Sequence, residues 1–195
     1  MTDKICLQLA SKSPRRRELL AQIGVPFQCV DVEVPEVQEA DESALDYVLR
    51  LSKDKAQAGA IAAPGLPTLG ADTIVLFESR ALEKPRDLEH AIDMLIAMSG
   101  KQHSVISAVT ITDGQQTLTD HSETKVTFRD LREGEIERYW ATGEPQDKAG
   151  AYGIQGLGAV FVSALAGSYT GVVGLPLEQL FPMLSKFNIP YWRSV

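Results

Sequence analysis

The chain has 195 residues, 44% of them hydrophobic and 23% charged, with a formal net charge of −7 at pH 7. This composition is typical of a soluble globular protein with a substantial core, and it excludes the broad basic surface of a non-specific nucleic-acid-binding protein. No apolar run approaches the roughly 20 residues of a membrane span, and no signal peptide is evident. We therefore expect a cytoplasmic protein without nucleic-acid or membrane partners.

The first half of the chain predicts alternating strands and helices. Apolar, β-prone runs predict strands at residues 5–10, 27–34 and 68–77. Apolar residues at helical spacing predict a helix with Ser13 as N-cap that is closed by Gly24, a second over about 42–63, and a third from Asp87 to Gly100.

The second half predicts hairpins and short helices. Strands at 102–112 and 116–128 flank Asp113-Gly114 and should pair antiparallel. A short helix is expected around 133–141, a further hairpin from 159–164 and 169–173, and a last helix over 177–186. The predicted fold is therefore an α/β or α+β protein with a mixed sheet.

The two cysteines, Cys6 and Cys29, both lie in strand-like runs. They have no CxxC spacing and no histidine close by, so the sequence indicates neither a zinc site nor a redox motif. We expect both to be buried free thiols.

A basic loop follows the first predicted strand and precedes the first predicted helix. Lys12 and Arg15 to Arg17 place four cations within six residues of an acidic chain, beside Ser11 and Ser13. A helix N-terminus with guanidinium groups binds phosphate oxygens well, so this loop predicts a phosphorylated ligand. The alternative is an ordinary helix start with a solvated basic turn, although basic residues in a first turn oppose the helix dipole.

Glycine is concentrated near the C-terminal end. Eight of the fifteen glycines lie between Gly143 and Gly174, including the segment GAYGIQGLG at 150–158. This spacing matches neither GxGxxG nor the P-loop. It predicts tight turns or close approach to a ligand, with a plain glycine-rich connection as the alternative.

Asp72 lies between two apolar, β-prone flanks. An unpaired carboxylate would be costly to bury there, so it should be exposed at a bend after Gly70, neutralised by a partner, or bound to a cation. A structural role in a turn is the alternative.

Three further charged residues could each, taken alone, be an ordinary surface or turn residue. Lys55 shares a helical face with apolar residues, Lys84 precedes Pro85, and Glu36 follows a predicted strand. With the basic loop and Asp72, they supply the cations and carboxylates of a phosphate-hydrolysing site with a divalent metal.

Several segments together resemble the Maf family of nucleoside triphosphate pyrophosphatases. They are LASKSPRRRELL at 9–20, LGADT at 69–73, LEKP at 82–85, Ser99-Gly100 with His103 and Val105, KAGAYGIQG at 148–156 and VGLPL at 173–177. The resemblance implies a fold like that of inosine triphosphatase, in one domain over residues 1–195 with two lobes around a cleft. It also implies hydrolysis of a nucleoside triphosphate to the monophosphate and pyrophosphate, Mg²⁺ or Mn²⁺ as cofactor, and a homodimer.

The resemblance also implies roles for individual residues. It assigns catalysis to Asp72 as proton acceptor with Lys55 and Lys84, metal binding to Glu36 and Asp72, and substrate binding to Ser11, Arg15, Arg16, Thr73 and Gln155. The residues matching Arg15, Thr73 and Gln155 are associated with base choice, and this trio resembles the branch acting on dTTP and UTP.

Two positions depart from the family pattern. Pro35 stands where an acidic residue is frequent, and Gly171 stands where Asn is frequent.

Three other functions remain as alternatives: a pyrophosphatase for 7-methyl-GTP, one for purine nucleotides, and a nucleotide-binding division regulator with little catalysis.

Overall fold

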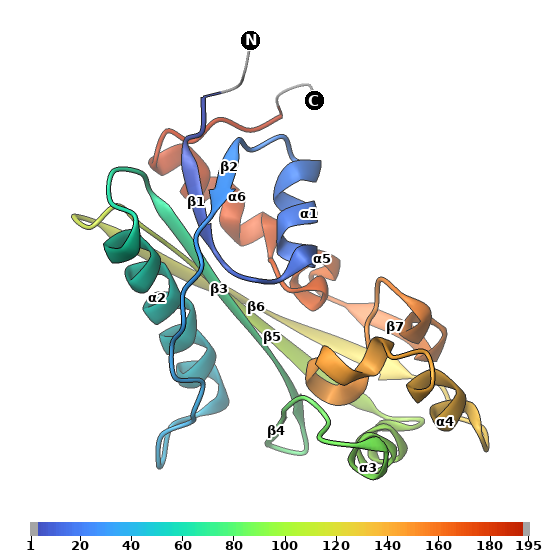
Figure 1. The fold of residues 1–195 in the computed structure, drawn as a ribbon. Coiled ribbons are helices and arrows are strands. Elements are labelled where there is room, and N and C mark those ends of the chain that lie inside the picture. Colours follow the sequence, from blue (N-terminus) through green and yellow to red (C-terminus); the bar gives the residue numbers. More distant parts are fainter. Residues whose placement is uncertain (1–3, 193–195) are drawn as a thin grey trace. The chain divides into compact units, whose positions relative to one another are not determined.

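The computed structural model describes residues 4–192, in which seven strands form one mixed sheet (Figure 1). The strands are β1 (Leu7–Ala10), β2 (Phe27–Cys29), β3 (Thr68–Phe77), β4 (Arg80–Leu82), β5 (Gln102–Thr112), β6 (Thr117–Phe128) and β7 (Val162–Ala166). Their order is β2-β1-β3-β5-β6-β7, with β4 paired to β3. The sheet confirms the predicted mixed fold class.

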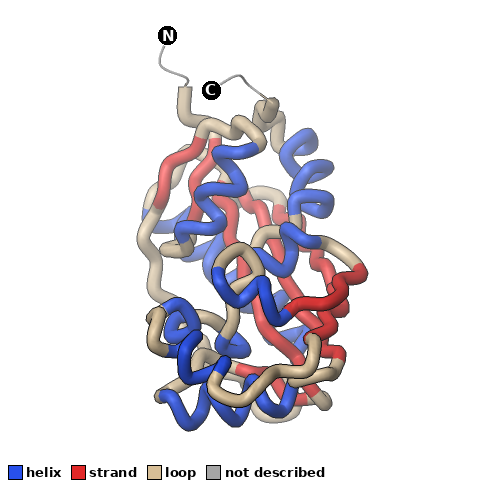
Figure 2. Tube along the Cα trace, turned by 90° about the vertical axis from the view of Figure 1, so that its right-hand side faces the viewer, coloured by secondary structure: helices blue, strands red, loops and turns tan. Residues whose placement is uncertain are grey.

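Helices are interleaved with these strands along the chain (Figure 2). The α-helices are α1 (Pro14–Gln22), α2 (Ala44–Ala62), α3 (Leu88–Met98), α4 (Glu135–Trp140), α5 (Tyr169–Val173) and α6 (Leu177–Lys186). Three 3₁₀-helices are η1 (Glu144–Asp147), η2 (Ala149–Ala151) and η3 (Leu157–Phe161). Within residues 4–192, no helix combines the length and the apolar character that crossing a membrane requires.

Backbone contacts divide the chain into two compact units. Unit 1 contains the residues up to Asp72, Ser107–Ser122 and the residues from Gly174 onward, and unit 2 contains Thr73–Ile106 and Glu123–Val173. Each unit is described by itself below.

Unit 1 is built on the parallel strands β2, β1 and β3. Leu7 pairs with Phe27, and Gln8 pairs with Thr68. Helix α2 packs on one side of these strands, and α1 and α6 lie on the other (Figure 1). Because both faces are covered, every residue of β1 is buried.

Gly70 lets α2 approach β3 closely. A Cβ at this position would overlap the Ser52 carbonyl oxygen and the Ala56 amide nitrogen of α2. The bend that we expected after Gly70 is absent, since β3 continues as one strand from Thr68 to Phe77. The glycine therefore serves helix packing.

Unit 2 packs α3 and α4 around an aromatic core. Buried residues of this core include Leu95, Met98, Phe128 and Phe161. Asp87 caps α3 by accepting the His90 amide proton at 2.8 Å, which confirms the predicted helix start.

Most predicted elements are confirmed, and three differ. Strand β2 ends at Cys29 instead of continuing to residue 34. Its partner β1 ends at Ala10, so no further backbone groups of β1 are available for pairing. The short strand β4 was not predicted. It follows a tight turn at Glu78 and Ser79, both with positive φ, and this turn lacks the usual glycine signal.

The predicted hairpin of 159–164 with 169–173 is wrong. Strand β7 pairs antiparallel with β6, and Tyr169–Val173 forms helix α5. Ser168 starts this helix, since its hydroxyl accepts the Gly171 amide proton at 3.1 Å and its carbonyl accepts that of Val172. The capping bonds therefore outweigh the β-propensity of the segment.

The cysteines are free, as expected, but they are not both buried. Cys29 is exposed because β2 is an edge strand of the sheet, and Cys6 is partly buried with its Sγ 3.2 Å from the Pro26 carbonyl oxygen.

Candidate active site

The basic loop connects β1 to α1 in unit 1. Ser13 occupies the N-cap position but makes no side-chain capping bond, and Pro14 is the first helical residue. The Ser13 amide instead donates to the Ser11 hydroxyl at 3.2 Å. The α1 N-terminus thus carries no side-chain cap, as a site for a phosphate oxygen requires.

Arg16 fixes this loop. Its Nε donates to the Gly174 carbonyl at 2.8 Å, ahead of α6, and its Nη1 donates to the Ser11 hydroxyl at 3.2 Å. Burial lowers the pKa of Arg16, while the nearby charges of Asp72 and Glu36 oppose that shift and Arg15 adds to it. The guanidinium is therefore electrostatically coupled to both predicted carboxylates.

Lys55 joins the two carboxylates directly. Its Nζ lies 2.7 Å from Asp72 Oδ1 and 2.6 Å from Glu36 Oε1. The side chains of Lys55 and Asp72 are only 12% and 11% exposed, whereas that of Glu36 is 52% exposed. Of the interpretations of Asp72, neutralisation by a partner is the one that the structure bears out.

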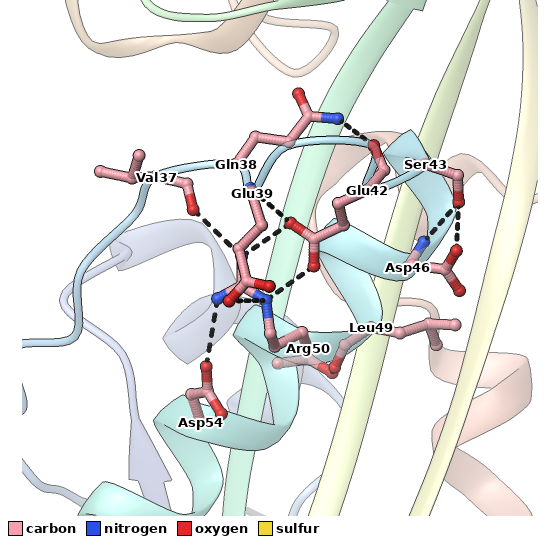
Figure 3. Close-up of polar contacts among 10 residues, drawn as sticks. Val37, Gln38, Glu39, Glu42, Ser43, Asp46, Leu49, Arg50 and Asp54 are labelled. Carbon is pink, nitrogen blue, oxygen red and sulfur yellow. Dashed lines mark hydrogen bonds and ion pairs between the residues drawn. The ribbon is translucent and has the colours of Figure 1, made fainter.

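Arg50 ties the segment after Glu36 to helix α2 (Figure 3). Its Nε and Nη2 donate to the two carboxylate oxygens of Glu42 at 2.6 and 2.8 Å, and Nη2 also donates to the Val37 carbonyl at 3.0 Å. The hydrogen bond from Arg50 lowers the pKa of Glu42, and Glu42 raises that of Arg50.

Our sequence reasoning missed this arrangement. Glu42 and Arg50 are eight residues apart, and Glu42 lies before the helix begins, so no helical spacing connects them. The Glu42 carboxylate and the Val37 carbonyl reach the Arg50 guanidinium only because of the backbone conformation of residues 37–42.

The chemistry of the Glu36 and Asp72 carboxylates suits a hard divalent cation. Among residues 4–192, no three His, Cys, Asp or Glu side chains are placed to hold a metal together. Mg²⁺ nevertheless binds through one or two carboxylates with substrate phosphates and water, and the carboxylates of Glu36 and Asp72 converge on one ammonium group. These two residues could hold the ion together with a triphosphate.

Three predicted site residues belong to unit 2. Thr73 follows Asp72 on β3, Lys84 is exposed between β4 and α3, and Gln155 is exposed between η2 and η3. Their participation in the same site stays a prediction. In unit 1, the structure brings together Ser11, Arg16, Glu36, Lys55 and Asp72, and Arg15 directly precedes Arg16 on α1.

A sequence profile described as "Maf-like protein" matches residues 6–187 of the chain. The chain belongs to the Maf family. A dTTP/UTP pyrophosphatase of Saccharophagus degradans is 54% identical over 193 residues, covering 97% of this chain and 92% of that protein. A protein of the same name from Yersinia pestis is 56% identical over 182 residues, covering 93% and 92%.

A solved structure shares the fold of this Maf-family chain. The HAM1 protein of Coxiella burnetii superposes with a TM-score of 0.50 at 17% identity, covering 94% of this chain and all of that one. At this identity the likeness concerns the fold alone.

Proposed function

We propose that this Maf-family chain hydrolyses dTTP and UTP to the nucleoside monophosphate and pyrophosphate. The observation that carries the proposal is the convergence of Glu36 and Asp72 on Lys55, with Arg16 coupled to both carboxylates. This is the charge arrangement that phosphoryl transfer to water needs. The pyrimidine substrates are proposed from the names of relatives at 54% and 56% identity.

In the proposed reaction, Asp72 accepts a proton from the attacking water. The water oxygen bonds to the α-phosphorus, the bond from that phosphorus to the α–β bridging oxygen breaks, and pyrophosphate leaves. Arg15, Arg16, Lys55 and Lys84 would stabilise the negative charge of the leaving group. Mg²⁺ or Mn²⁺, bound by Glu36, Asp72 and phosphate oxygens, would supply charge neutralisation and a more acidic water.

Substrate binding is assigned to the remaining predicted residues. Ser11 and the α1 N-terminus would contact phosphate oxygens, and Arg15, Thr73 and Gln155 would determine base choice. The amide of Gln155 can both donate to and accept from a pyrimidine edge. We further propose a single Maf-like domain over residues 1–195, a cytoplasmic location and a homodimer.

A nucleotide panel with an Asp72→Asn variant tests this function. We expect the variant to retain the fold and to lose at least about 100-fold in kcat, because the proton acceptor is removed. Pyrophosphate and orthophosphate are measured separately with Mg²⁺ and with Mn²⁺. The matched control is Asp113→Asn, at a carboxylate that accepts amide protons in the β5–β6 turn.

The panel also separates the alternatives. Faster turnover of 7-methyl-GTP or of purine nucleotides would contradict the pyrimidine assignment. Orthophosphate as the first product would indicate a terminal phosphatase. Tight dTTP binding without metal-dependent hydrolysis would favour a regulator, and near-normal turnover of Asp72→Asn would remove Asp72 from the mechanism.

A further inference from the structure

A half-buried carboxylate in unit 2 organises the glycine-rich segment at 150–158. Glu144 Oε2 accepts the Leu157 amide proton at 2.8 Å, and Oε1 accepts those of Gly158 at 3.0 Å and of the Tyr139 hydroxyl at 2.7 Å. The Tyr139 oxygen in turn accepts the Gly153 amide proton at 3.1 Å. We call these five residues the Glu144 network.

The glycines of the segment make room for this network. A Cβ at Gly156 would overlap the Glu144 carboxylate, and one at Gly158 would lie 2.6 Å from the Tyr139 oxygen. The carboxylate therefore occupies the place that an anionic ligand takes in an anion-binding loop of backbone amides. The close approach predicted from the glycines is an approach to the protein's own side chains.

The electrostatics favour an ionised Glu144. Burial opposes the charge, but the hydrogen bonds from Leu157, Gly158 and Tyr139 outweigh it and hold the pKa of Glu144 below its ordinary value. Burial raises the pKa of Tyr139, so its hydroxyl stays a donor at neutral pH. Its ring is held against Phe161, with centroids 5.0 Å apart.

Gln155 lies between the two attachment points of the network. Gly153 is held through Tyr139 on one side, and Leu157 and Gly158 are held by Glu144 on the other, while the Gln155 side chain is exposed. Because the backbone is held at Gly153 and at Leu157, Gln155 can move only through the backbone torsions of residues 154–156. We propose that Glu144 is a positioning residue for Gln155 and thereby for discrimination between bases, which rests on the proposed function.

The test compares two substrates on one enzyme. The ratio of kcat/KM for dTTP to that for GTP does not depend on how much of a preparation is folded. In Glu144→Gln one carboxylate oxygen becomes an NH₂ group that cannot accept an amide proton, so we expect this ratio to fall roughly tenfold, the loss typical of a charge-assisted hydrogen bond. Amide exchange at Leu157 and Gly158 should accelerate in the same variant.

Two further variants make the result decisive. Tyr139→Phe keeps the aromatic ring, removes the bridge to Gly153 and should lower the ratio roughly fivefold. Glu135→Gln breaks a comparable pair with Arg129 in unit 2, outside the Glu144 network, and should leave the ratio unchanged.

The outcomes distinguish the inference from the function on which it rests. A wild type that prefers dTTP, with Glu144→Gln and Tyr139→Phe ratios within twofold of it, overturns the positioning role alone. If Glu144→Gln does not fold, the Tyr139→Phe ratio decides. A wild type without any preference for dTTP overturns the proposed function, and the inference falls with it.

Discussion

Lys55 is shared by the carboxylates of Glu36 and Asp72 in unit 1, and its surroundings determine what its removal would do. Asp72 is only 8% exposed and depends on this ammonium group, while Glu36 is half exposed and is solvated by water as well. Removing one partner of a buried ion pair leaves an uncompensated charge in a poorly solvated place. Lys55 therefore affects the stability of unit 1 in addition to any part in catalysis.

We expect Lys55→Met to lower the free energy of unfolding by about 3 kcal/mol, because the buried Asp72 carboxylate loses its ion pair and only the charge of Arg16 remains nearby. Urea denaturation at pH 7 measures this. The double variant Lys55→Met/Asp72→Asn should recover much of the loss. The control is Lys125→Met, which breaks an exposed pair with Glu123 and should change stability by less than about 1 kcal/mol. A Lys55→Met protein as stable as the wild type would contradict the pairing.

Among the secondary-structure elements, α2 contacts both the strand that carries Asp72 and the segment that follows Glu36. The helix carries Lys55 toward β3, and it carries Arg50 toward the segment of residues 37–42 (Figure 3). Ser43 starts the helix by accepting the Asp46 amide proton at 3.1 Å. Because Glu36 directly precedes Val37, we infer that Arg50 helps to place Glu36 beside Lys55.

We therefore expect Arg50→Ala to raise the Mg²⁺ concentration for half-maximal hydrolysis several-fold, because the chain after Glu36 loses its attachment to α2. A metal titration of the initial rate measures this, at saturating dTTP. Arg129→Ala is the matched control, since Arg129 makes a similar two-oxygen pair with Glu135 in unit 2. An unchanged metal requirement in Arg50→Ala would show that Glu36 is positioned without Arg50, or that it binds no metal.

At the scale of the whole molecule, a buried histidine affects the dependence of stability on pH. His103 is 3% exposed, its Nε2 is hydrogen-bonded to the Tyr152 hydroxyl at 2.8 Å, and its ring lies against Phe128. Burial lowers the pKa of His103 from 6.5 to about 4. The unfolded chain therefore binds a proton at a pH where the folded protein does not.

We expect the free energy of unfolding to fall by about 2 kcal/mol between pH 7 and pH 5 through this one group, because each pKa unit corresponds to 1.36 kcal/mol. Denaturant unfolding across that range measures the slope, which His103→Gln should flatten. Glu135 does not account for this change. Hydrogen bonding from Arg129 lowers the pKa of Glu135 from 4.5 to about 2, so the stability that this ion pair contributes is lost only below pH 5. His121→Gln serves as control, and a slope unaffected by His103→Gln would contradict the assignment.

Features local in the chain were predictable. The bounds of β3 and β5 and the capped start of α3 follow from apolar periodicity and capping residues, which act over a few residues. The family was recognisable for the same reason, since its motifs are contiguous runs.

The residues alone predicted the mixed fold class, most helices and strands, and the charged residues that we propose for a triphosphate site. Three sets of contacts could not be predicted: those of Lys55 with Glu36 and Asp72, that of Arg50 with the segment after Glu36, and that of Gly156 with the Glu144 carboxylate. These contacts form between residues that the fold brings together across turns and strands, and periodicity carries no information about them. For the same reason β2 ended early and Tyr169–Val173 became a helix, because available partners outweighed local propensity.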